Sequence, residues 1–423
     1  MQSHFANNSD RKFLMHYNEQ KKTINAFIQK GVHIPCPDSV EIGSDVNPDR
    51  ISSNVTIHTG CKIYGEKTLI LANTIIGEEA PSTIKNCYIG EHVHLKGGFY
   101  EGAVFLNHSQ MGSCAHVRKG TILEEYASGA HTVGLKQTIL FPFVTLGSLI
   151  NFCDCLMAGG TSRKDHSEVG SSYIHFNYTP NQDKATGSLI GDVSNGVMLN
   201  RAPIFLGGQG GLVGPCRIAY GTIIVAGSVY RKDILKENQL VMDGAMRHAS
   251  IGYTKGLYQN INRIVENNLV YIANLVALSH WYYYIRPLWT TDSMTTALNK
   301  GLFETINVAI EERITQFKKF CDKMPDSIRA FQSISAKASP VIDSKQKLYE
   351  NCDQVINIIR QALPPSANDY NRDLFMEALS NVKDKAYLEQ IQALNEKTRA
   401  DGIKWLQNIV DSIHENALNI VRI

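Results

Sequence analysis

The feature that most constrains the fold is an aliphatic residue that recurs every six positions in the first half of the chain. It occurs without interruption at five successive positions, Ile51, Ile57, Ile63, Leu69 and Ile75. A helix would repeat near 3.6 residues, whereas an even period puts every marked residue on the same side of an extended chain. The pattern therefore indicates short strands. The period returns later at Ile89, Leu95, Leu140, Val144, Leu146, Ile150, Phe152, Leu156, Leu206, Leu212, Ile218 and Ile224.

Such strands are expected to coil into a prism in which each coil stacks its aliphatic residue on the coil below. No single coil can bury its apolar face alone, so many coils must stack. Gly, Asn, Ser and Thr fill the positions between the aliphatic residues, as frequent turns require. An antiparallel β-sandwich with coincidental spacing is the alternative. We expect a parallel β-helix of the hexapeptide-repeat type over residues 33–240.

Both flanks of the repeat are expected to be helical. Residues 1–32 allow a short N-terminal helical segment, and residues 250–423 have the apolar spacing of an α-helical domain. Pro287 and Pro325 should end the first two helices of that domain. The expected helices cover 255–286, 293–323, 341–362, 369–383 and 385–419.

Two side-chain clusters in the helical half have simple structural interpretations. The aromatic run at 281–284 is interpreted as packing between helices or against the end of the β-helix. Glu311, Glu312 and Arg313 are interpreted as a solvated helix face. No catalytic constellation stands out in this half.

Composition limits the classes of partner. The 423 residues carry 42 basic and 40 acidic side chains, so the net charge of +2 favours neither nucleic acid nor a membrane surface. The most apolar stretch, 269–278, is too short to span a bilayer. A polar N-terminus without an apolar core predicts no secretory signal. Nine cysteines without a CxxC pair predict reduced thiols, no metal site and a cytoplasmic location.

A specific resemblance appears at residues 177–192. Asn177-Tyr178, Lys184, Thr186 and Ile190-Gly191-Asp192 resemble a segment of the acetyltransferase domain of the bifunctional N-acetylglucosamine-1-phosphate uridylyltransferase / glucosamine-1-phosphate acetyltransferase. The likeness covers residues 30–240.

Two further segments extend this resemblance. Arg118-Lys119-Gly120 is similar to the family's Arg-Pro-Gly, and Lys136 follows eighteen residues later at the family's spacing. The last repeats end in Arg231, Lys232 and Asp233, as the family's last coils end in a basic residue and an Asp.

The resemblance implies a left-handed β-helix, a homotrimer and sites between neighbouring subunits. Only the resemblance supports the left hand, because crossovers between parallel strands are usually right-handed. It implies a sugar phosphate or sugar nucleotide as substrate and acetyl-CoA as acyl donor. The implied substrate-binding residues are Arg118, Lys136, Asn151, Asn177 and Tyr178. The implied coenzyme-binding residues are Lys184, Arg231 and Lys232.

The residue types suit this chemistry. Arg and Lys bind phosphates, and an Asn side chain offers both a donor and an acceptor to a polar substrate group. Surface charges with no ligand are the alternative for Arg118, Lys136, Arg231 and Lys232.

The general base departs from the family pattern. Acetyl transfer needs a base that titrates near the operating pH, usually a histidine. Counting from Arg118 and Lys136, the family's catalytic histidine falls on Ser148, and the tyrosine that follows it falls on Asn151. His166 is the preferred substitute because it lies in a polar loop near the Asn-Tyr segment. His131 and His175 are expected to have structural or surface roles.

Two other departures bear on function. Thr179-Pro180 replaces the family's Asp-Gly, which alters the coenzyme pocket. The uridylyltransferase half has no counterpart, and GGQGG at 207–211 lacks the Lys-Ser/Thr of a phosphate-binding loop.

Three hypotheses follow. The first is a hexapeptide-repeat acyltransferase-like enzyme. The second is a non-catalytic sugar-nucleotide-binding protein, and the third is a trimeric scaffold whose helices recruit a partner.

Overall fold

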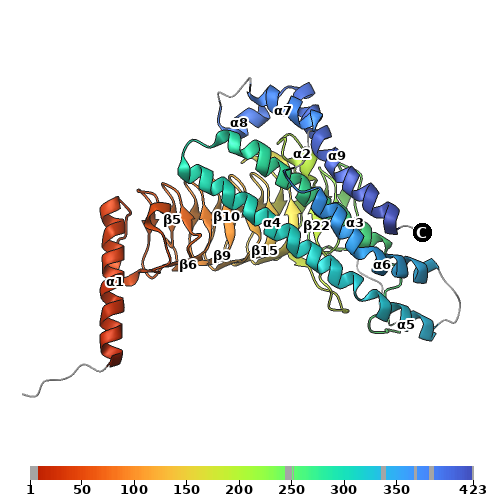
Figure 1. The fold of residues 1–423 in the computed structure, drawn as a ribbon, viewed down its shortest axis with the longest axis horizontal. Coiled ribbons are helices and arrows are strands. Elements are labelled where there is room, and N and C mark those ends of the chain that lie inside the picture. Colours follow the sequence, from red (N-terminus) through yellow and green to blue (C-terminus); the bar gives the residue numbers. More distant parts are fainter. Residues whose placement is uncertain are drawn as a thin grey trace, which may run out of the picture.

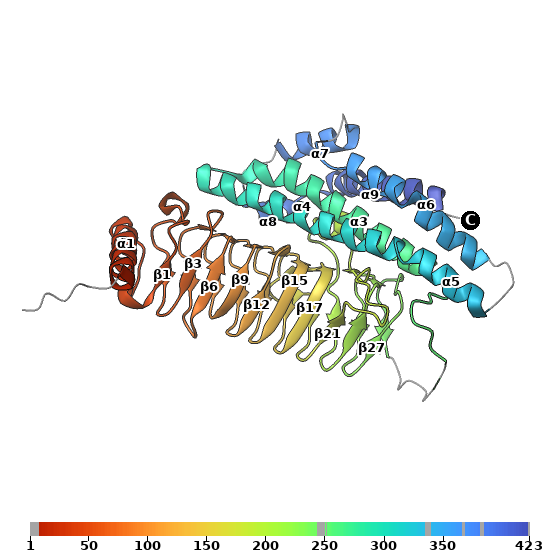
Figure 2. The ribbon, with the colours of Figure 1, turned by 60° about the horizontal axis from the view of Figure 1, so that its bottom comes forward.

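A computed structural model describes residues 8–242, 250, 252–334, 340–365, 369–380 and 385–421. Residues 41–241 form a left-handed parallel β-helix, and a layer of helices follows it along one side (Figures 1 and 2). The fold predicted from the six-residue period and the family resemblance is therefore confirmed. Among the described residues, one sheet of 10 strands forms one face of the prism, and one sheet of 16 strands bends around an edge to form the other two.

The strands stack on three faces. Face 1 contains β2 (Thr56–Ile57), β5 (Ile75–Ile76), β8 (His94–Leu95), β11 (Gln110–Met111), β14 (Ser128–Gly129), β16 (Thr145–Leu146), β20 (Glu168–Val169), β23 (Phe205–Leu206), β26 (Ile223–Ile224) and β28 (Leu240–Val241). Face 2 contains β1 (Glu41–Ile42), β3 (Lys62–Tyr64), β6 (Ser82–Lys85), β9 (Gly98–Glu101), β12 (Ala115–Val117), β21 (Ile174–Phe176), β24 (Gly211–Val213) and β27 (Val229–Tyr230). Face 3 contains β4 (Leu69–Ile70), β7 (Tyr88–Ile89), β10 (Ala103–Phe105), β13 (Thr121–Leu123), β22 (Ser188–Ile190) and β25 (Arg217–Ile218).

Two long strands, β15 (Val133–Leu140) and β17 (Ile150–Met157), run from face 2 onto face 3 without a break. β15 pairs with β12 on face 2 through Val117 and Leu135, and with β13 on face 3 through Ile122 and Ile139. The edge between faces 2 and 3 is therefore continuous backbone in these two coils.

The core consists of the inward residue of each short strand. Ile57, Ile76 and Leu95 occupy equivalent positions on successive coils of face 1 and have no exposed surface. The six-residue period slips by one position between Ile63 and Ile70, so Ile75 faces outward instead of inward and is half-buried. The extra residue lies in the turn between β3 and β4, so the short strands on either side keep their inward-facing residues.

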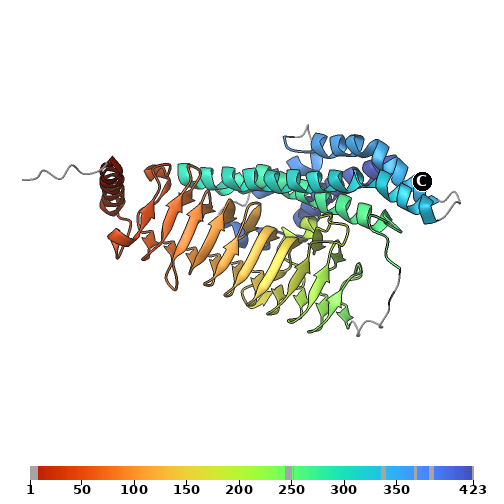
Figure 3. The ribbon, with the colours of Figure 1, turned by 90° about the horizontal axis from the view of Figure 1, so that it is seen from below.

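Helices close one end of the prism and cover one face. α1 (Asn8–Lys30) lies across the N-terminal end (Figures 1 and 3), where Ile24 and Phe27 are buried. α4 (Ser293–Cys321) runs along face 3 and contacts β4, β7, β10 and β13. α3 (Asn262–His280) lies against β22 on the same face.

The remaining helices form an outer layer. They are α5 (Met324–Ile334), α6 (Pro340–Gln361), α7 (Tyr370–Ser380), α8 (Tyr387–Gln392) and α9 (Glu396–Val421), while α2 (Val193–Gly196) is a short turn within the β-helix. α5 is absent from the prediction, which treats Pro325 only as the end of a helix; proline is also tolerated in the first turn of a helix, and Pro325 is the second residue of α5. The single helix expected over 385–419 is in fact α8 and α9. Parts of the helix expected over 369–383 lie outside the described residues.

The aromatic run packs between helices as predicted, except that Tyr283 is 39% exposed. Trp281 and Tyr282 are buried in a π-helical turn (Trp281–Ile285) that follows α3. The Trp281 indole donates to the Tyr387 hydroxyl at 2.9 Å, and the Tyr282 hydroxyl donates to Glu124 of the β-helix at 2.6 Å. In the part of the chain that the structure describes, no helix combines the length and apolar character needed to cross a membrane.

Candidate functional site

The candidate site follows the edge of the prism between faces 2 and 3, which we call the corner ridge. It comprises residues 118–119, 136–137, 153–154, 177–187 and 231–233. Six successive turns of the β-helix from β12 onward lie at this edge, and all of them except the turn at 213–216 contribute to the ridge.

Strand register brings the first members together. The Arg118 amide donates to the Leu135 carbonyl at 2.9 Å, and Lys136 pairs with Cys153 of the next coil. Side chains alternate along β15, so Leu135 points into the core while Lys136 is half-exposed. Arg118, Lys136 and Cys153 therefore stack on three consecutive coils.

Unusual backbone geometry creates the corner itself. Gln137 and Asp154 have φ angles of 53° and 60°, in the left-handed region that side chains rarely adopt. These residues turn the long strands from face 2 onto face 3. The turn exposes the residue before it, Lys136, and points Asp154 toward the helical layer.

The ridge carries a row of cations. Arg118, Lys119, Lys184, Arg231 and Lys232 are exposed. Together with Lys136, they form no ion pair with a carboxylate among the described residues. Stacked unpaired cations are a favourable environment for a phosphate group.

Cys153 is a structural thiol. It is buried and donates to the Asn151 side-chain oxygen at 3.1 Å. Burial raises the pKa of the Cys153 thiol, the neighbouring Asp154 carboxylate raises it further, and the Arg118 guanidinium opposes both effects. The thiol form is therefore favoured, and Cys153 is a poor nucleophile.

The Asn177 loop, residues 177–187, leaves the β-helix between β21 and β22. The Asn177 amide nitrogen donates to Asp154 at 2.6 Å. Tyr178 is 56% exposed, and Lys184 is also exposed. The predicted residues Arg118, Lys136, Asn177, Tyr178 and Lys184 are thus distributed along one edge.

Asn151 lies beside the ridge. It is the second residue of β17, exposed on face 2, two positions before Cys153. Its backbone amide donates to the Tyr173 carbonyl at 3.1 Å.

His166 and Ser148 lie elsewhere on the prism. His166 is on the hairpin of β18 (Gly160–Ser162) and β19 (Asp165–His166), which occupies the edge between faces 3 and 1. The expectation that His166 lies near the Asn-Tyr segment is wrong, because the width of face 3 separates them. Ser148 lies at the third edge, between faces 1 and 2, where its amide donates to the Ser171 hydroxyl at 3.1 Å.

The other histidines considered have different environments. His175 is buried, contacts the Ser188 hydroxyl at 2.7 Å, and has its pKa lowered to about 4 by burial. It is a neutral core residue. His131 is exposed on a turn, with Nδ1 3.4 Å from the Thr132 hydroxyl.

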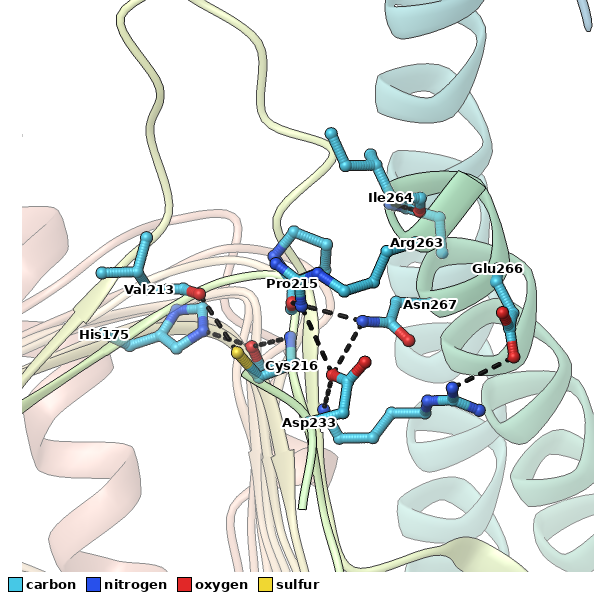
Figure 4. Close-up of polar contacts among 12 residues, drawn as sticks. His175, Val213, Pro215, Cys216, Asp233, Arg263, Ile264, Glu266 and Asn267 are labelled. Carbon is cyan, nitrogen blue, oxygen red and sulfur yellow. Dashed lines mark hydrogen bonds and ion pairs between the residues drawn. The ribbon is translucent and has the colours of Figure 1, made fainter. Parts of the chain in front are cut away.

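The last coil is anchored to α3 (Figure 4). Asp233 accepts from the Arg217 amide and from the Asn267 side chain, both at 2.9 Å. The Arg263 guanidinium donates to the Pro215 carbonyl at 2.8 Å and lies 3.4 Å from Asp233. Arg231 and Lys232 precede this anchor and remain exposed at the end of the ridge.

Sequence reasoning missed Arg313. We expected a solvated face, and Glu311 is indeed exposed, but Arg313 is only 2% exposed and pairs with Asp154 at 2.8 Å. The sequence contained a signal for this burial. Arg313 follows Ile306 and Ile310 and precedes Phe317 at helical spacing, so it shares their apolar face.

Comparison with known proteins finds relatives that match about half of this chain. No family model matches the chain. The bifunctional protein GlmU of Listeria monocytogenes is 25% identical over 243 residues, which cover 56% of this chain and 47% of the relative. The bifunctional protein GlmU of Thermotoga petrophila is 27% identical over 227 residues, covering 53% of this chain and 45% of the relative.

The β-helix is GlmU-like. The chain spans about half the length of the curated relatives it matches. The similarity and the fold together support a hexapeptide-repeat, acyltransferase-like protein, and the predicted resemblance to the family's acetyltransferase domain is confirmed at this level.

Proposed function

We propose that the corner ridge binds a sugar phosphate or sugar nucleotide and that the protein transfers an acyl group to it from acetyl-CoA. The observation that carries the proposal is the row of cations without ion pairs along the edge that also holds Asn177, with Arg118 and Lys136 on consecutive coils. Arg118 and Lys136 would bind phosphate, while Asn177, Asn151 and Tyr178 would contact the sugar.

The coenzyme would lie toward the end of the ridge. Lys184, Arg231 and Lys232 are exposed and suited to its phosphates. In the transfer, the thioester carbonyl carbon bonds to an acceptor nitrogen or oxygen, and the carbon–sulfur bond breaks. The acceptor's proton passes to a base, and the coenzyme leaves as a thiol. A cytoplasmic homotrimer with sites between subunits is part of this proposal.

A second candidate is a sugar-nucleotide-binding protein without transferase activity. The position of Ser148 favours it, since a serine hydroxyl is a poor general base. His166 lies one face away from Asn177, so within one chain it does not reach the ridge. For His166 to act as the base at the ridge, a neighbouring subunit would have to supply it.

Calorimetric titration with UDP-N-acetylglucosamine and with acetyl-CoA tests the proposal. Lys136→Ala and Asn177→Ala should each weaken binding about tenfold or more, because hydrogen bonds to charged groups contribute about 1.5–3 kcal/mol. Lys404→Ala, at an exposed site on α9, is the matched control and should leave the Kd unchanged.

The outcomes separate the candidates. Binding of both probes supports the acyltransferase, and a turnover assay with His166→Gln then tests that histidine as the base. Binding of the sugar nucleotide alone supports the non-catalytic candidate. Binding of neither probe by the wild-type protein overturns both.

A further inference from the structure

The helical layer holds the Asn177 loop from outside the β-helix. The Tyr258 hydroxyl donates to Asp183 at 2.7 Å, and the Asn268 side chain of α3 donates to the Ala185 carbonyl at 2.9 Å. The Lys323 ammonium donates to the Asn181 carbonyl at 2.8 Å. The loop's conformation therefore depends on residues far away in the sequence.

Arg313 of α4 makes a buried contact with the same region. Its guanidinium pairs with one carboxylate oxygen of Asp154 at 2.8 Å, and both side chains are 3% exposed or less. It also donates to the Lys184 carbonyl at 3.3 Å, at the other end of the loop. Arg313 thus joins the corner of β17 to the Asn177 loop.

Asp154 determines how the Asn177 amide is oriented. The second carboxylate oxygen of Asp154 accepts from Asn177 at 2.6 Å. A carboxylate paired with a guanidinium only accepts hydrogen bonds, so the Asn177 nitrogen must face it. The Asn177 side-chain oxygen accepts no hydrogen bond from the described residues and is left for a ligand.

We propose that Arg313 and Asp154 are positioning residues that fix Asn177 with its oxygen available to accept from an N–H or O–H group of the ligand. The inference rests on the proposed function of the ridge. A buried ion pair is weak evidence for stability, because desolvation offsets the Coulomb attraction. Its contact with a half-exposed residue of the candidate site gives it a role in recognition, and makes the helical layer part of that site.

The test removes both charges together. The double variant Asp154→Asn/Arg313→Met leaves no uncompensated buried charge, and the new amide can donate to or accept from Asn177. The orientation of Asn177 is then no longer fixed. The Kd for UDP-N-acetylglucosamine should rise about tenfold, close to the effect of Asn177→Ala.

A second buried ion pair provides the matched control. Glu125 of the β-helix pairs with Arg286 of the helical layer at a different edge of the prism. Glu125→Gln/Arg286→Met removes the same kind of link without touching the ridge. It should bind UDP-N-acetylglucosamine with the wild-type Kd. An equal rise of the Kd in both double variants would mean that Arg313 has only a structural role.

The outcomes are distinguishable. If Asn177→Ala weakens binding but the Asp154/Arg313 double variant binds normally, the positioning role is overturned and the proposed function stands. If the wild-type protein binds neither UDP-N-acetylglucosamine nor acetyl-CoA, the proposed function fails and this inference fails with it.

Arg313→Lys keeps the test decisive if the double variant does not fold. A lysine ammonium keeps a charge for Asp154 but lacks the planar fork that also reaches the Lys184 carbonyl. The Asn177 loop should loosen and the Kd should rise about threefold to tenfold. A wild-type Kd for this folded variant would overturn the inference.

Discussion

Gly301 lies where α4 crosses the β-helix, and alanine at this position should weaken the docking of the helix. A Cβ atom there would lie 2.2 Å from Cδ1 and 2.3 Å from Cγ of Tyr88 on β7. Cγ is at the root of the ring and moves only if χ1 of Tyr88 leaves its rotamer or the backbone shifts. The Tyr88 hydroxyl also donates to Glu304 of α4 at 3.0 Å, which restrains the far end of the ring.

Two opposing effects set the magnitude. Alanine is about 1 kcal/mol more favourable than glycine inside a helix. Overpacking costs about 1–3 kcal/mol, and contacts this short belong at the upper end of that range. Gly301→Ala should therefore lower the free energy of unfolding by about 1–2 kcal/mol, the opposite sign to the helix propensity.

Urea denaturation checks this reasoning with Gly301→Ala, Tyr88→Ala, Tyr88→Phe and the two double variants that combine Gly301→Ala with each Tyr88 substitution. In a Tyr88→Ala background the ring is gone, so Gly301→Ala should become neutral or stabilising by up to about 1 kcal/mol. In a Tyr88→Phe background the ring remains, so the full destabilisation should persist. A raised urea midpoint for Gly301→Ala alone, or the same loss in the Tyr88→Ala background, would refute the packing described.

Two buried groups predict how stability depends on pH. Burial lowers the pKa of His175 from 6.5 to about 4, so the unfolded chain binds the proton first. The free energy of unfolding should fall by about 3 kcal/mol as pH decreases from 6.5 to 4. His175→Gln should remove this contribution in urea titrations, and an unchanged pH profile would contradict it. Burial raises the pKa of Glu124 from 4.5 to about 7, so its contribution is lost as pH rises through that interval. Glu124→Gln keeps an acceptor for Tyr282, and should raise the urea midpoint relative to wild type at pH 8 but not at pH 4; equal shifts at both would contradict it.

The local sequence pattern was enough to predict the β-helix and part of the corner ridge. Side chains alternate between the two sides of a strand, so a residue that recurs every six positions always faces the same side. The aliphatic residues at this period can therefore all face the interior of stacked coils. Eighteen residues are three such repeats, so Lys136 had to stack beside Arg118 on the next coil. The helices α3, α4 and α6 followed from their apolar spacing and from proline stops.

Insertions in the β-helix limited how far the six-residue period could assign residues to the faces and edges of the prism. The hairpin at 160–166 and the Asn177 loop interrupt the period, so the sequence did not show which edge each histidine would occupy. His166 was placed near Asn177 because the two are eleven residues apart, but a strand of face 1 and a strand of face 2 intervene. Sequence proximity is a poor guide to distance where each turn changes face.

The sequence by itself determined the repeat, the cation row and the helical character of the second half, because each depends on residues close together in the chain. Only the tertiary structure decided that α4 covers face 3 and that Arg313 reaches Asp154. The rest of the β-helix and α3 lie between those two residues in the chain, and no periodicity links them. The charge of Arg313 suggested solvent, and its burial became favourable only because the fold supplied a carboxylate to pair with it.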